Sequence, residues 1–323
     1  MTDVTQSTIA RPTRSRTKAH IPLIALALLA LAIAAPFFLY PVFLMKVLCF
    51  ALFAAAFNLL LGYGGLLSFG HAAYFGGAAY VSAHAAKVWG LTPELAILSG
   101  TLAAGVLGLV IGALAIRRQG IYFAMVTLAF AQMVFFFALQ APFTGGEDGI
   151  QAVPRGHLFG LLSLQSNRTL YFVVLGIVTL GLLAIYRIVN SPFGQVLKAI
   201  RENEPRAISL GYRVNQYKLA VFVLSAALSG MAGATKAIVF QLASLTDVAW
   251  TMSGEVVLMT LLGGMGTIFG PLVGAGVIVA IQNYFATAGA WVTVIQGVIF
   301  VIAVLLFREG IVGVIARWLK RPL

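Results

Sequence analysis

Ten apolar stretches of roughly 20 residues follow one another along most of this chain. A helix needs about 20 apolar residues to cross the hydrocarbon core of a bilayer. The stretches cover 21–40, 42–61, 66–86, 94–116, 121–139, 169–189, 218–243, 251–266, 267–286 and 290–307. They are continuous rather than alternating, which argues against a transmembrane β-barrel. The pattern predicts an all-α polytopic membrane helix bundle of about ten spans, with eight as the alternative.

Composition supports a membrane protein over every soluble class. Of the 323 residues, 61% are hydrophobic and 9% are charged. Soluble domains are about 45–50% apolar and about 25% charged. A soluble enzyme, a nucleic-acid-binding module and a disordered scaffold are therefore excluded. The net charge of +12 is informative through its location, because cytoplasmic loops of membrane proteins carry an excess of Lys and Arg.

The basic residues gather on one side of the predicted topology. With the N-terminus in the cytoplasm, the inside segments 1–20, 62–65, 117–118, 190–217 and the C-terminal tail, with the adjoining span ends, hold 16 of the 21 Lys and Arg. The positive-inside rule then requires an even number of spans. We expect a basic cytoplasmic tail at 1–20, a transmembrane domain at 21–310, a second basic cytoplasmic tail at 311–323, and both termini in the cytoplasm.

The longest internal cytoplasmic loop, 190–217, predicts two short helices. Ser191 before Pro192 is a helix-start signal, and Pro205 after Asn203 and Glu204 repeats it. Gly211 is a plausible helix stop. An apolar stripe follows helical spacing at Phe193, Val196, Leu197 and Ile200. Such a loop either lies on lipid headgroups or docks a cytoplasmic partner.

The longest external loop, 140–168, contains a dense turn signal. It reads Thr144, Gly145, Gly146, Glu147, Asp148 and Gly149. Two adjacent carboxylates are too few for Ca²⁺, which takes six or more oxygens. We expect a tight turn that faces a periplasmic partner or caps the mouth of a pathway, and no metal site.

Glycines mark two further regions. Gly266, Gly270 and Gly274 are spaced by four and predict a contact at which two helices approach closely. Between residues 62 and 70 the glycines fit either close packing or an unwound helix start that lines a pathway.

Ionisable residues inside the spans are few. Lys236 and Glu255 both lie toward the outer face, where they either pair or reach the interface separately. His71 is either a proton relay or a hydrogen-bonding group within the bundle. The chain has no nucleotide-binding motif, no metal-binding histidine pair and no catalytic set, so any ATP and Mg must be bound by another chain.

Five motifs in order give the chain its resemblance to a family. They are 65–73 (GLLSFGHAA), 120–128 (GIYFAMVTL), the external signature 144–149, 198–204 (KAIRENE) with Ala207 and Gly211, and 259–266 with Gly270 and Pro271. Over residues 40–310 the chain resembles the LivM-type permease subunits of bacterial branched-chain amino acid ABC importers.

The resemblance implies a multi-pass protein of the bacterial inner membrane. It also implies a second homologous permease, two ATP-binding cassette subunits and a periplasmic solute-binding protein as partners. The 190–217 loop would seat in an ATPase groove. Coupling would then involve Phe193, Val196, Leu197, Ile200, Arg201, Glu202, Pro205, Ala207 and Gly211. The solute would be a branched-chain amino acid or a related small polar solute, and the chain would carry no cofactor of its own.

Two other classes of function compete with this interpretation. An ion-coupled secondary transporter needs intramembrane ion sites, for which only Lys236 and Glu255 are candidates. An integral-membrane enzyme needs clustered catalytic groups, which the spans lack.

Overall fold

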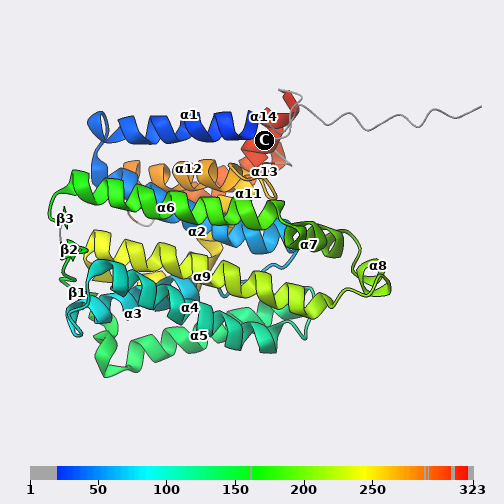
Figure 1. Ribbon diagram of the computed structural model, residues 1–323, viewed down its shortest axis with the longest axis horizontal. Helices are drawn as coiled ribbons and strands as arrows, with labels where there is room; N and C mark the ends of the chain where they lie inside the picture. The colour runs from blue at the N-terminus through cyan, green and yellow to red at the C-terminus, as the bar shows by residue number, and fades with distance from the viewer. Residues whose placement is uncertain (1–19, 161, 287–288, 290, 307–309, 319–323) are drawn as a thin grey trace, which may run out of the picture.

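The computed structural model describes residues 20–160, 162–286, 289, 291–306 and 310–318, and it is a bundle of helices (Figure 1). The longer helices run roughly along one direction. One end of the bundle carries the short strands and is called the strand end here. The opposite end carries α7 and α8 and is called the α7–α8 end.

The helices are α1 (His20–Ala34), α2 (Pro41–Asn58), α3 (His71–Lys87), α4 (Pro93–Ala115), α5 (Ile121–Gln140), α6 (Asn167–Asn190), α7 (Pro192–Glu202), α8 (Glu204–Ser209), α9 (Val214–Phe240), α10 (Leu245–Val248), α11 (Trp250–Gly263), α12 (Gly270–Tyr284), α13 (Trp291–Leu306) and α14 (Gly310–Trp318). Short helical turns are η2 (Ala35–Phe37), η3 (Leu59–Tyr63), η4 (Pro142–Thr144) and η5 (Gly146–Asp148). The strands are β1 (Ile150–Gln151), β2 (His157–Leu158), β3 (Leu162–Ser163) and β4 (Leu242–Ala243).

Each of the ten predicted apolar runs contains a helix, and the all-α membrane bundle is confirmed. Five helices are long and apolar enough to cross a membrane, namely α2 with η3, α4, α5, α6 and α9. The others among the ten are shorter; α11, with 14 residues, spans only about 21 Å at 1.5 Å per residue.

The two expected basic tails are 1–20 and 311–323. Residues 1–19 of the N-terminal tail and 319–323 of the C-terminal tail lie outside the described residues. Within the expected C-terminal tail, the chain forms α14 and buries Val312. This segment is therefore a packed helix, because its apolar residues lie against the ends of α11 and α12.

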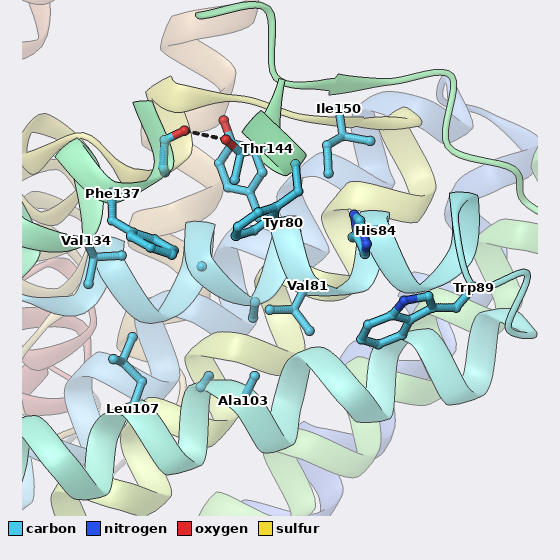
Figure 2. A pocket seen from close by; sticks show the side chains of 15 residues that line it. Tyr80, Val81, His84, Trp89, Ala103, Leu107, Val134, Phe137, Thr144 and Ile150 are labelled. Atoms are coloured by element: carbon cyan, nitrogen blue, oxygen red, sulfur yellow. Dashed lines mark hydrogen bonds between the residues drawn. The ribbon is translucent and has the colours of Figure 1, made fainter. Parts of the chain in front are cut away.

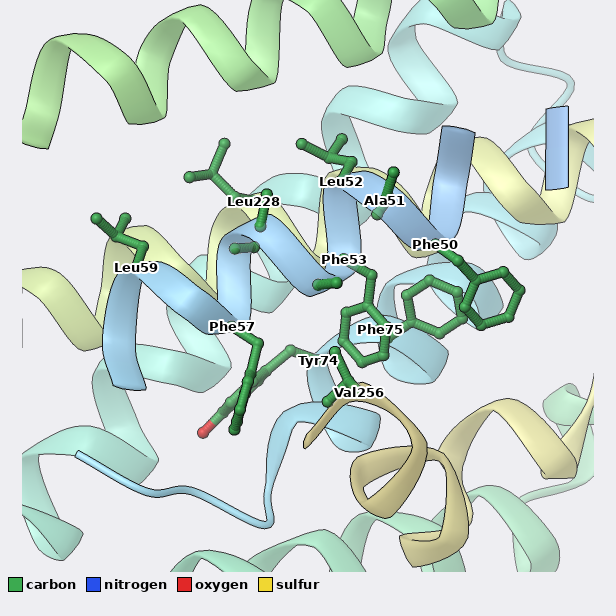
Figure 3. Packing of buried hydrophobic residues seen from close by; sticks show 14 of the residues in the cluster. Phe50, Ala51, Leu52, Phe53, Phe57, Leu59, Tyr74, Phe75, Leu228 and Val256 are labelled. Atoms are coloured by element: carbon green, nitrogen blue, oxygen red, sulfur yellow. The ribbon is translucent and has the colours of Figure 1, made fainter. Parts of the chain in front are cut away.

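The core lies along α2 and α9, which are the most deeply buried of the long helices. Phe53 of α2 packs on Phe75 of α3 with ring centroids 4.4 Å apart, and Phe50 approaches the same ring at 5.7 Å. Figure 3 shows these aromatic rings between α2 and α3, with Val256 of α11 beside them. In contrast, only about a third of each of α4, α5 and α6 is buried, and all three expose several large apolar side chains, as expected of lipid-facing helices.

Small residues allow close helix contacts. A Cβ on Gly274 of α12 would lie 1.8 Å from the Met259 carbonyl oxygen of α11. Gly270 also packs closely, because its carbonyl oxygen would lie 1.9 Å from a Cβ on Gly263.

Gly266 departs from the expected helix contact. Helix α11 ends at Gly263 because Gly264 adopts a φ of 124°, a conformation that favours glycine. Gly266 therefore lies in the connector 264–269, outside any helix. The close contact joins α11 and α12 through Gly263, Gly270 and Gly274.

Replacing Gly274 with Ala should destabilise the fold, because the new methyl group collides with backbone that cannot rotate away. Overpacking of this kind costs about 1–3 kcal/mol. Gly276 of the same helix is the matched control, since a Cβ there meets nothing closer than 4.0 Å. Thermal unfolding in mild detergent should show a lower midpoint for Gly274→Ala than for Gly276→Ala. Equal midpoints would contradict the close contact.

Candidate functional site

The α7–α8 end presents the two-helix corner that the sequence predicts. The Ser191 side chain accepts a hydrogen bond from the Gly194 backbone N–H at 3.3 Å, and Pro192 opens α7. Asn203 repeats the arrangement for α8, accepting from the Arg206 N–H at 3.0 Å. The chain thus turns at Asn203, between α7 and α8. Gly211 follows α8 with a φ of +86°.

The apolar stripe of α7 faces its own bundle. Leu197 and Ile200 are buried, and Phe193 stacks on Tyr217 of α9 with centroids 5.5 Å apart. Ala207 of α8 is buried with Ile200 and Val214, and Val196 packs against this group. These residues therefore anchor α7 and α8 to the bundle, and the buried Leu197, Ile200 and Ala207 leave no surface for a partner.

The free face of the corner is formed by other residues. Glu202, Pro205 and Gly211 are exposed. Ile208, Leu210 and Tyr212 are exposed as well, by 58%, 68% and 39%. Sequence reasoning missed these three, although three large apolar side chains in an otherwise polar loop are a visible signal.

Arg201 joins the corner to a break in the core. Its Nη1 atom donates to the carbonyl oxygen of Gly62, at the end of η3. Its side-chain carbons pack on Gly65, where a Cβ would lie 3.0 Å from Cγ. The neighbouring Lys198 ammonium lies 5.6 Å from the centre of the Tyr63 ring. One face of α7 therefore rests on the segment 62–65.

Asn58 joins the same region to the second break. Its side-chain Nδ2 donates to the Thr267 carbonyl oxygen at 2.8 Å, and its Oδ1 accepts from the Gly266 N–H at 2.9 Å. The connector 264–269 is thereby fixed to the end of α2. We call Asn58, Gly62, Arg201, Gly266 and Thr267 the Arg201 junction.

A second tie holds α8 in place. The Lys218 ammonium of α9 lies 2.7 Å from the Glu204 carboxylate, and Lys218 is 6% exposed. Gln119, in the turn before α5, donates to the same carboxylate oxygen at 3.2 Å. The corner thus contacts α9 and the α4–α5 turn as well as the junction.

The segment 64–70 is an unwound helix start, one of the two alternatives that its glycines leave open. It has no helical structure, and side chains supply hydrogen bonds to its backbone. The Phe69 N–H donates to Thr127 Oγ1 at 3.2 Å and the Gly70 N–H to Ser68 Oγ at 3.1 Å. The next helix begins with the Ala72 N–H bonded to Ser253 Oγ at 2.9 Å.

His71 is held inside the bundle. Its Nε2 lies 2.9 Å from Ser225 Oγ, which itself donates to the Ala56 carbonyl oxygen at 2.6 Å. The ring is fully buried and stands edge-on to Phe57 at 4.8 Å. This geometry is that of a hydrogen-bonding group that joins α3, α9 and α2.

At the strand end, the external signature forms a tight turn. Thr144 donates to the carbonyl oxygens of Ala138 and Ala141, both at 2.6 Å, at the end of α5. A Cβ on Gly149 would lie 2.2 Å from the Ala243 carbonyl oxygen, so only glycine fits there. Glu147 and Asp148 are exposed at the tip, with Gly145 and Gly146 beside them.

The external loop is tied to α9 by a pairing that the sequence did not indicate. Strand β1 pairs antiparallel with β4, with Ile150 opposite Ala243. Arg155 donates to the Val239 carbonyl oxygen and to Asn167 Oδ1, both at 2.9 Å. The loop therefore links the ends of α5, α6 and α9.

Of the two alternatives for Lys236 and Glu255, the pairing of one with the other is wrong. Lys236 instead contacts the buried Asp247 of α10, at 2.6 Å, because the capping box of Ser244 and Asp247 turns that carboxylate back toward α9. Glu255 accepts from Gln282 at 2.9 Å. Within the described part of the chain, no group of three or more His, Cys, Asp and Glu is placed to hold a metal ion.

Comparison with known proteins decides the family. The model of the family described as "branched-chain amino acid transport system / permease component" matches residues 39–304. The chain belongs to this family. It is a membrane permease subunit of an ABC importer, as its motifs predict.

Individual relatives agree with this assignment. The LivM permease proteins of the high-affinity branched-chain amino acid transport systems of Salmonella typhimurium and Escherichia coli are 27% and 28% identical. Each alignment covers 81% of this chain and 67% of the relative. The ribose import permease RbsC of Bacillus subtilis is 29% identical, over 55% of this chain and 58% of the relative. No solved structure matches, and none of these similarities supports the ion-coupled alternative.

Replacing Asn58 with Ala should weaken the permease fold at the junction. The change leaves the Gly266 N–H and the Thr267 carbonyl oxygen, both partly buried, without their side-chain partner. An unsatisfied buried group costs about 1–3 kcal/mol. Asn190→Ala is the control, because Asn190 is exposed and bonds only to Tyr186 one turn earlier. A midpoint of thermal unfolding that is as high for Asn58→Ala as for Asn190→Ala would argue against the junction.

Proposed function

We propose that this chain is the LivM-type subunit of a bacterial inner-membrane importer for branched-chain amino acids. It pairs with a second homologous permease, and two ATP-binding subunits bind ATP and Mg on the cytoplasmic side. A periplasmic binding protein delivers the solute. The solute is a branched-chain amino acid or a related small polar solute, because the LivM proteins named above belong to such systems.

In this proposal the α7–α8 end is cytoplasmic and the strand end is periplasmic. Ten helices cross the bilayer wholly or in part, with both termini inside. Arg117, Arg118, Lys198, Arg201 and Arg206 all lie in or near the α7–α8 end, in keeping with the positive-inside rule.

The observation that carries the proposal is the connection from an exposed apolar corner to two helix breaks. Ile208 and Leu210 offer apolar side chains to an ATPase groove. Leu197, Ile200 and Ala207 hold the corner to the bundle, so that a displacement of α8 carries α7 with it. Arg201 then transmits the displacement to Gly62, and Asn58 transmits it to 264–269. ATP binding and hydrolysis in the partners would bias inward-facing against outward-facing states through this route.

Purification of the tagged chain from its native membrane in mild detergent tests the proposed assembly. We expect mass analysis to find a second permease and two ATP-binding subunits with it. Recovery of the chain alone, under conditions that keep a control ABC complex intact, would contradict the proposal.

Replacing Ile208 or Leu210 with Asp should reduce the recovery of ATP-binding subunits. An ionised side chain in an apolar groove loses its hydration without gaining a partner. Ser209→Asp is the matched control, because Ser209 is exposed between the two and belongs to the same short helix. Co-purification should fall for the two apolar positions and persist for the control. Equal recovery from all three variants would place the docking surface elsewhere.

Replacing Arg201 with Met should uncouple transport from ATP hydrolysis. Methionine keeps the apolar stem over Gly65 but removes the hydrogen bond to Gly62. A hydrogen bond from a charged group is worth about 1.5–3 kcal/mol, so we expect uptake per ATP hydrolysed to fall about 10- to 100-fold in reconstituted vesicles. Arg187 is exposed in the last turn of α6, at the α7–α8 end of the bundle. Arg187→Met should therefore leave the ratio intact. An unchanged ratio in Arg201→Met would remove the junction from the mechanism.

A further inference from the structure

A cavity of about 520 Å³ lies between α3, α4 and α5 at the strand end (Figure 2). This volume falls within the range of about 300–1,000 Å³ that is usual for ligand sites. Gly77 of α3, Leu107 of α4 and Phe137 of α5 are among the residues that line it. His84 and Trp89 lie nearer the end of α3. The lining contains no residue of the Arg201 junction and none of α7 or α8.

The mouth of the cavity is aromatic. The His84 ring stands edge-on to Trp89 at 5.4 Å and to Phe143 at 6.0 Å. Trp89 and Phe143 are exposed, by 61% and 55%. Tryptophan and tyrosine collect where a membrane protein meets the headgroup level of a bilayer. The mouth therefore opens at the level where lipid headgroups and acyl chains meet.

The walls are almost entirely carbon, and two of their polar atoms, the Tyr80 hydroxyl and His84 Nδ1, have no hydrogen-bond partner among the described residues. No Lys, Arg, Asp or Glu lines the cavity. The Tyr80 hydroxyl is buried and has no hydrogen-bond partner within the described part of the chain, and Tyr80 as a whole is 5% exposed. In Figure 2, Tyr80 extends from α3 toward the segment that carries Thr144. An unpaired buried hydroxyl is costly, so this group points to an acceptor that a ligand supplies.

These features exclude a zwitterionic solute as the occupant. An amino acid carries an ammonium and a carboxylate, and burying either without a charged partner is strongly unfavourable. A phospholipid acyl chain meets the opposite requirements, because it is apolar along its length and ends in an ester whose carbonyl oxygen accepts a hydrogen bond. The surrounding faces of α4 and α5 expose Val106, Val110, Met133 and Phe136, so the cavity adjoins a surface that faces lipid.

We propose that this cavity binds one acyl chain of a phospholipid from the leaflet at the strand end. The chain lies between α3, α4 and α5, and the Tyr80 hydroxyl donates to the ester carbonyl oxygen. The lipid fills the space that α5 leaves against α3 and α4. It thereby supports the helix whose end carries the external signature.

Lipid retention tests the proposal with a variant that fills the cavity. A Cβ on Gly77 meets only the Leu107 Cδ2 atom, at 4.0 Å, so Gly77→Leu places its side chain in the cavity without a backbone collision. Gly176→Leu is the matched control on a second membrane helix, since a Cβ there meets nothing within 4 Å. The protein is purified with its accompanying subunits, washed in delipidating detergent, and the retained phospholipid is measured by mass spectrometry.

We expect wild type and Gly176→Leu to retain one phospholipid that Gly77→Leu loses. Tyr80→Phe, which keeps the ring and removes only the donor, should weaken retention about two- to tenfold, as expected for one hydrogen bond. Equal retention in wild type and Gly77→Leu would overturn the proposal. Unfolding midpoints measured in parallel separate lipid loss from misfolding.

A fluorescence measurement addresses the same point without depending on purification yield. The chain has four Trp, and replacing the other three with Phe leaves Trp89 at the mouth as the only reporter. In bilayers of phospholipid brominated on the acyl chain, Trp89 should be quenched, and Gly77→Leu should reduce that quenching while Gly176→Leu should not. Quenching that is the same in both variants would count against the site, and protection by free leucine would assign the cavity to solute instead. Neither readout depends on transport, so failure here is distinct from failure of the proposed function.

Discussion

Every backbone N–H and C=O inside the bilayer must find a partner within the protein, because lipid offers none. This requirement dominates wherever a helix of this bundle is broken. At 64–70 the partners are Ser68 and Thr127, and at 264–269 they come from Asn58 and Thr267. At both breaks, polar side chains therefore hold non-helical backbone in a single arrangement.

The two breaks lie at the same end of the bundle and share one neighbour in α7. Arg201 contacts the first break directly, and Asn58 ties the second to the end of α2. Breaks of this kind bend more readily than continuous helix, because fewer backbone hydrogen bonds cross them. In the proposed assembly, a corner that is anchored by buried Leu197 and Ile200 and bonded to a break is suited to carry motion from a cytoplasmic partner into the membrane domain.

The opposite end is built for stiffness. The external loop pairs with β4, Arg155 bonds to two helix ends, and the buried pair of Lys236 and Asp247 fixes α10 to α9. Breaking a buried pair by removing one partner is strongly unfavourable. The strand end is therefore held by more ties than the end that carries the two breaks, and the buried charges of Lys236 and Asp247 belong to those ties.

The sequence by itself determined the class of protein, the family and the local structure of the loop 190–217. Continuous apolar runs admit only spanning helices, and Ser191, Asn203 and the two prolines act within one turn of their own position. Which side chains face outward was decided by the tertiary structure. The stripe at Phe193, Val196, Leu197 and Ile200 has the spacing of a docking face, yet it packs on α9, because periodicity reports that a face is apolar and not what covers it. The same holds for Gly266, whose spacing suggested a helix that the φ of Gly264 ends. It holds for Lys236 as well, because the capping box of Ser244 and Asp247 marks a helix start but does not say which cation meets the carboxylate. Contacts between segments distant in the chain depend on how the helices pack, and a single sequence does not contain that packing in readable form.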